Sequence, residues 1–174
     1  MLLKKCNAVL ALAAALLLAI HNALNARMMI LGRVNESPSL PAYILIGLLF
    51  LHIPISLFVL LKRNDGRGVR YTNISMGWLF QRVTGIALIP LILFHGFIRA
   101  GQFGIGLPAI LVAHFFIMLL AYLHIPLSVP NALLTLGLID TDAAYRTAHR
   151  VCRVVCALLF LAGLTASLWE VLVL

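Results

Sequence analysis

The chain is predicted to be an all-α integral membrane protein, a bundle of five transmembrane helices forming one domain over residues 1–174. Hydrophobic residues make up 63% of the chain and charged residues only 10%, and the mean hydropathy is +1.09. Soluble domains are roughly half apolar and a quarter charged, so the composition excludes a soluble fold. The apolar residues also gather in long runs, and a helix that crosses a membrane needs about 20 of them.

Five apolar runs are long enough to span a membrane. The first covers residues 7–31 and continues beyond the apolar core of a signal peptide, so we expect a retained helix. The other spans are expected at residues 41–61, 77–98, 107–129 and 149–173. Prolines, glycines and charged residues separate these runs, and no connection is long enough to fold as another domain.

The basic residues predict the orientation of the bundle. Most of them fall on one side: Lys4, Lys5, Lys62, Arg63, Arg67, Arg70, Arg82, Arg146, Arg150 and Arg153. Only Arg27, Arg33 and Arg99 fall on the other side. Because cytoplasmic loops carry the excess of Lys and Arg, we expect a cytoplasmic N-terminus and an external C-terminus.

Four histidines lie inside the apolar runs, where an imidazole is costly and usually functional. His52 and His124 each open a near-copy of one pentapeptide, His-Ile-Pro-Ile-Ser and His-Ile-Pro-Leu-Ser. His21 and His95 precede these copies at nearly the same interval, so the first and second helical pairs form a candidate internal repeat. A single buried histidine is more often a packing or hydrogen-bonding residue. Four in a duplicated pattern indicate two metal centres, each held by two helices.

Helix direction predicts how the four imidazoles pair. His21 and His95 lie late in helices that run outward, so both are expected in the outer half of the membrane. His124 lies late in an inward-running helix, and His52 lies nearer the middle of another. The pairs His21/His95 and His52/His124 would then ligate two b-type haems at different depths. Two histidine ligands saturate the iron, which suits electron transfer.

Several neighbouring residues fit this arrangement. Pro54 and Pro126 each remove one helical hydrogen bond, and Ser56 and Ser128 are expected to satisfy backbone groups nearby. The missing side chains of glycines within the third helix, Gly85 and Gly96, would let a macrocycle approach closely.

The remaining histidines and the cysteines are assigned less specific roles. His114 is expected to be a packing or quinone-site residue, and His149 a solvated residue near the membrane surface. The three cysteines lack the Cys-x-x-Cys-His pattern, which excludes c-type haem attachment. We expect no disulfide between Cys152 and Cys156, which lie one turn apart.

The segment from Gly77 to Gly85 reads Gly-Trp-Leu-Phe-Gln-Arg-Val-Thr-Gly and is followed by His95. It resembles the aromatic-x-x-Gln-x-x-Thr-Gly…His motif of the dihaem cytochrome b subunit of succinate:quinone oxidoreductases, chiefly quinol:fumarate reductases. The resemblance extends over almost the whole chain, including a final helix without a ligand. It implies the same haem pairs and menaquinone as the bound substrate. It also implies a flavoprotein subunit carrying FAD and an iron–sulfur subunit, both docked on the cytoplasmic face.

The resemblance also raises the question of proton and propionate partners. Glu36, in the loop after the His21 helix, is the candidate proton acceptor for quinol, and a solvated loop carboxylate is an equally good interpretation. Gln81 and Arg82 are candidate partners for the propionates of the inner haem, and Arg99 or Arg27 for those of the outer one. Some members of the family carry a glutamate at the position of Tyr122, so a transmembrane proton pathway of that kind is not expected here.

Two other functions remain open from the sequence. One is the haem b subunit of another membrane oxidoreductase, such as a nitrate reductase, hydrogenase or formate dehydrogenase. The other, from a different class, is a transporter without haem that uses histidines for proton relay or packing.

Overall fold

The computed structural model describes residues 2–31, 40–61, 76–99 and 107–173, and all regular structure in these ranges is α-helical. The helices are α1 (Leu2–Ile30), α2 (Leu40–Leu61), α3 (Met76–Arg99), α4 (Leu107–Leu136) and α5 (Asp142–Val173). Each is long and apolar enough to cross a membrane, which indicates a multi-pass membrane protein. The predicted all-α class and five spans are confirmed.

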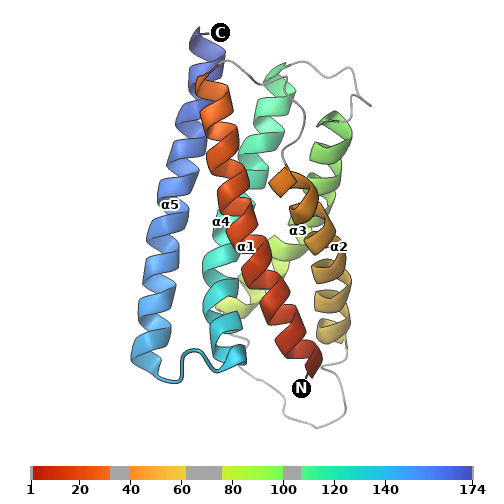
Figure 1. The fold of residues 1–174 in the computed structure, drawn as a ribbon, viewed down its shortest axis with the longest axis vertical. Coiled ribbons are helices and arrows are strands. Elements are labelled where there is room, and N and C mark those ends of the chain that lie inside the picture. The colour runs from red at the N-terminus through yellow and green to blue at the C-terminus, as the bar shows by residue number, and fades with distance from the viewer. Residues whose placement is uncertain (1, 32–39, 62–75, 100–106, 174) are drawn as a thin grey trace.

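The helices run alternately up and down, and α1 begins at the end of the bundle opposite to that where α5 finishes (Figure 1). Helices α1 and α4 pack together at the centre, and α5 packs against both. Helix α2 packs on α1 and α3 packs on α4. Among the described residues, no Cα atom of α2 lies within 8 Å of α3 or α4, so the close backbone packing of α2 is against α1.

Large apolar side chains cover much of the outer surface. Phe50, Leu158 and Leu172 are each more than 60% exposed, with values of 69%, 61% and 80%. A soluble monomer rarely exposes contiguous apolar surface on this scale, whereas hydrocarbon accepts it at no cost. The core is instead built from small residues, such as Ala14, Ala121 and Ala166, which let the helix backbones approach closely.

The connection between α4 and α5 differs from the prediction. Helix α4 passes through Pro126 and Pro130 and ends at Leu136, beyond the expected end at residue 129. Pro130 has no amide proton and removes one helical hydrogen bond. Its ring is among the most buried side chains of the described residues, so it packs well within the bundle. The helix stops at Gly137, whose φ of +75° places it in the left-handed region that favours glycine.

Helix α5 begins earlier than the expected residue 149. Thr141 accepts a hydrogen bond on its side-chain oxygen from the Ala144 amide at 3.2 Å, which caps the free amides of the first turn. Asp142 adds a negative charge at the positive end of the helix dipole. The basic residues Arg146, Arg150 and Arg153 therefore lie on the helix itself.

Candidate metal centre

His124, on α4, is held against α3 by the Thr-Gly pair of the Gln-x-x-Thr-Gly motif. Its Nδ1 lies 3.1 Å from Thr84 Oγ1, and its Nε2 lies 2.9 Å from Ser128 Oγ. The ring lies directly over Gly85, where a Cβ atom would come within 2.9 Å of the ring carbon Cε1. The sequence assigned Gly85 a close approach to a macrocycle; in the structure it is the His124 imidazole that approaches it.

His52, on α2, has a related environment. Its Nε2 lies 3.4 Å from Ser56 Oγ, and Ser56 donates to Oδ1 of Asn7, on α1, at 2.9 Å. The Nδ1 atom of His52 is buried and makes no hydrogen bond to any residue that the structure describes. Since a buried imidazole nitrogen normally has a partner, this atom is a candidate ligand for an electrophile such as a metal ion.

The two environments share one unit of three residues. In each, the pentapeptide serine bonds its own histidine and also an amide side chain from the preceding helix, Asn7 for Ser56 and Gln81 for Ser128. Gln81 Nε2 donates to Ser128 Oγ at 3.2 Å. Asn7 precedes His21 by the same interval by which Gln81 precedes His95. This shared interval was the sequence signal for Asn7, whose role the sequence analysis missed.

His52 and His124 also lie close enough for their charges to interact, although their helices have no close backbone contact. Arg82, which is half-buried, also lies close enough to His124 for their charges to interact. His52 and Arg82, both predicted for the inner site, thus lie within electrostatic range of His124, and ligation of one haem by His52 and His124 remains a prediction. Gln81 is bonded to Ser128 and to Asn131, so its predicted role with a haem propionate remains a prediction.

The outer histidines have different neighbours. His95, on α3, stacks on His114, on α4, with ring centroids 5.9 Å apart and an interplanar angle of 19°. His21 Nε2 lies 2.9 Å from the Asn25 amide, one turn along α1. The pairing of His21 with His95 remains a prediction. The ring of His114 beside His95 could not be read from the sequence, because it depends on how α3 and α4 pack.

The remaining predicted residues lie either outside the described part of the chain or at other positions on the helices. Glu36 and the charged loop at residues 62–70 lie outside the described residues, as does the side chain of Arg99. His149 is half-buried, with its ring 6.3 Å from that of Tyr145. All three cysteines are free thiols, which confirms the prediction for Cys152 and Cys156.

No group of three or more His, Cys, Asp or Glu side chains is gathered as a metal site within residues 2–31, 40–61, 76–99 and 107–173. A haem iron needs only two protein ligands, because the macrocycle supplies four nitrogens.

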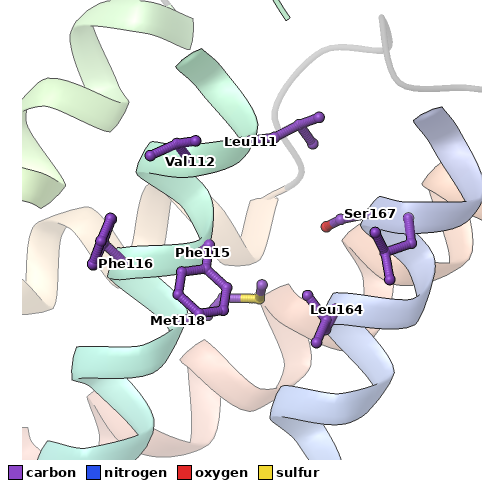
Figure 2. A pocket seen from close by; sticks show the side chains of 8 residues that line it. Leu111, Val112, Phe115, Phe116, Met118, Leu164 and Ser167 are labelled. Atoms are coloured by element: carbon purple, nitrogen blue, oxygen red, sulfur yellow. The ribbon is translucent and has the colours of Figure 1, made fainter. Parts of the chain in front are cut away.

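An apolar cavity of about 290 Å³ lies between α4 and α5, and its lining includes no histidine. Figure 2 shows its lining, which includes Phe115, Met118 and Leu164. Ser167 contributes the only hydroxyl among the lining residues, and it donates to the Gly163 carbonyl at 2.9 Å. This cavity offers room for hydrocarbon and no chemistry.

No family model, curated protein or solved structure matches this chain.

Proposed function

We propose that this protein is the dihaem cytochrome b subunit of a quinol:fumarate reductase or succinate:quinone oxidoreductase. It would anchor a flavoprotein and an iron–sulfur subunit to the cytoplasmic membrane. It would pass electrons between menaquinol or menaquinone and the iron–sulfur subunit. The proposal combines the motif resemblance with the arrangement of the buried histidines.

The shared His–Ser–amide unit of the two hairpins carries the proposal. A packing histidine requires one hydrogen-bond partner, and nothing in packing demands that two of them recur with the same serine and an amide at the same relative position. A duplicated pair of metal ligands would account for it, because each copy must hold its imidazole in a defined orientation. The same recurrence supports an internal repeat of α1–α2 and α3–α4.

The residues present fit a haem at the inner site. His52 has a buried nitrogen without a described partner, and His124 is oriented by Thr84, Ser128 and Gly85. His52 and His124 would hold the inner haem, and His21 and His95 the outer one. A haem with two histidine ligands supplies one-electron redox chemistry and binds no oxygen.

The other residues of the chain have roles that follow from their chemistry. The apolar helices exclude water and ions from the histidines. Arg82 offers a cation to a haem propionate beside His124. The basic residues at one end favour the cytoplasmic side and would attract a partner subunit. Glu36 is proposed to accept a proton from quinol, and its conversion to Gln would then slow quinol oxidation while leaving the haem spectra unchanged.

The proposal is tested by a dithionite-reduced minus oxidised visible spectrum of the purified full chain, with haem measured against protein. We expect b-type bands and about two haems per chain. Replacing His124 or His95 by Gln should each remove about one haem, because each site then lacks one axial ligand. His149→Gln is the matched control and should keep both haems.

Haem content is normalised to helical, membrane-inserted protein measured by far-UV circular dichroism, so that loss of folding is not read as loss of a ligand. A colourless wild-type protein overturns the proposal. Full pigment in both ligand variants overturns it as well.

A further inference from the structure

A continuous chain of hydrogen bonds runs from the start of α5 through α4 and α3 to His124. It passes from Tyr145 to Asn131, then to Gln81, Ser128 and His124. Beyond the imidazole it continues to Thr84 and ends at a backbone carbonyl of α3. The direction of each bond in this chain can be worked out, because Asn131 and Thr84, on either side of His124, each donate to a backbone carbonyl, which only accepts.

The first end determines the orientation of two amides. Asn131 Nδ2 donates to the Leu127 carbonyl at 2.7 Å, so the nitrogen of this amide, and not its oxygen, faces that carbonyl. Its second proton is donated to Gln81 Oε1 at 3.2 Å. Gln81 must then direct its own nitrogen toward Ser128 Oγ, which accepts at 3.2 Å. Ser128 keeps its single proton for His124 Nε2, 2.9 Å away.

The Thr84 side of the chain determines whether the second ring nitrogen of His124, Nδ1, carries a proton. The Thr84 hydroxyl donates to the Phe80 carbonyl at 2.7 Å, which uses its only proton. Thr84 can therefore only accept from His124 Nδ1, at 3.1 Å. Both arguments lead to the same neutral tautomer, with the proton on Nδ1 and the lone pair on Nε2.

We infer that Thr84, Gln81 and Asn131 are positioning residues that hold His124 in the Nδ1–H tautomer, with Nε2 presented as the metal ligand. The tautomer is argued from the hydrogen bonds alone, whereas ligation of a metal by Nε2 rests on the proposed function. A ligand histidine that donates its other N–H to an acceptor becomes more basic and is fixed in orientation. With a haem bound at Nε2, Ser128 would direct its proton to another acceptor, and helical serines can reach the carbonyl four residues earlier.

His52 is set differently. Ser56 donates its proton to Asn7, so His52 Nε2 is the donor toward Ser56, and the lone pair lies on Nδ1. Position 10 is the counterpart of Thr84 in the first hairpin and holds Leu10, which offers no acceptor. The inference therefore applies to one side of the inner centre and predicts an effect on that haem alone.

The test is potentiometry of the purified full chain carrying Thr84→Val, read at both haems. Loss of the acceptor makes His124 less basic and favours the ferrous state, so the inner haem equilibrium should move about tenfold, which is about 59 mV upward for one electron. The outer haem potential and a content of about two haems should not change. Thr84→Ser restores the acceptor and should restore the potential.

Thr165→Val is the matched control, because Thr165 bonds only carbonyls of its own helix α5. An unchanged inner potential in Thr84→Val, or an equal shift in Thr165→Val, overturns the inference while two haems still support the proposed function.

A colourless wild-type protein would reject the proposed function, and the tautomer is then read directly. Full-length protein labelled with ¹⁵N-histidine in micelles reports the protonated nitrogen, with the His124 signal assigned by its loss in His124→Gln. An Nδ1–H signal that gives way to Nε2–H in Thr84→Val supports the inference. An Nε2–H signal in the wild type overturns it.

Discussion

The hairpins α1–α2 and α3–α4 carry the same histidine–serine–amide unit and surround it differently. In the second hairpin, Thr84 and Gly85 clasp the His124 ring; at the equivalent positions the first hairpin has Leu10 and Ala11. The second hairpin also extends its polar network to α5 through Asn131, where the first has Val59. One imidazole is thus held on both ring nitrogens and the other on one. The common unit sets where each imidazole lies, and its surroundings set how rigidly that imidazole is held.

The largest difference between the hairpins should come from Gly85→Ala. The new methyl group would lie 2.9 Å from the His124 ring, so the ring must move and weaken its bonds to Thr84 and Ser128. We expect a loss of about 1–3 kcal/mol in the free energy of unfolding, as for other overpacked sites. The measurement is unfolding of the full chain by SDS titration in micelles, followed by circular dichroism.

Gly47→Ala, on α2, is the control for this change. Nothing lies within 4 Å of a Cβ atom there, so the substitution should leave stability unchanged or raise it by up to about 1 kcal/mol through helix propensity. Equal stability of the Gly85 and Gly47 variants would show that His124 is not tightly held.

A smaller difference is expected between the two amides. The Gln81 side chain bonds both Ser128 and Asn131, whereas among the described residues the Asn7 side chain bonds Ser56. Side-chain hydrogen bonds in membranes contribute about 0.6 kcal/mol each on average. Gln81→Ala should therefore cost about 1.2 kcal/mol and Asn7→Ala about half of that in the same SDS titration. The reverse order would contradict the idea that the second hairpin is the more firmly connected one.

The smallest effect concerns the link to α5. Tyr145→Phe removes the hydroxyl that donates to Asn131 at 3.1 Å and keeps the ring beside His149. We expect a cost of about 0.6 kcal/mol or less. Amide hydrogen exchange should rise in the first turns of α5 and stay unchanged in α1 and α2. Faster exchange in α2 would mean that the two hairpins are coupled through α5.

Most of the fold could be predicted because membrane-spanning length and apolar composition are local properties. The spans containing His21, His52 and His95 were found within a few residues of their observed ends, apart from the longer N-terminal start of α1. Helices α4 and α5 were misjudged where they meet. The helix was expected to end before Pro130. In the structure Pro130 lies inside α4 and its side chain is buried, and burial depends on the packing of separate helices.

The candidate site could be predicted in part. His52 and His124 were paired from their depth and from the repeated pentapeptide, and the structure brings them within range of each other. The neighbours that orient His124 were not foreseen. Thr84 was read as part of a motif leading to His95, because neighbours in sequence were easier to connect than residues on facing helices.

By itself, the sequence determined that this is a five-span helical membrane protein with imidazoles at repeated places, since apolar length and residue spacing act along a single helix. Only the tertiary structure decided that Thr84 and Gly85 contact His124, and that His114 stacks on His95. These depend on the rotation and approach of separate helices. In a hydrocarbon setting, small residues and paired polar groups select that packing, and no local pattern encodes it.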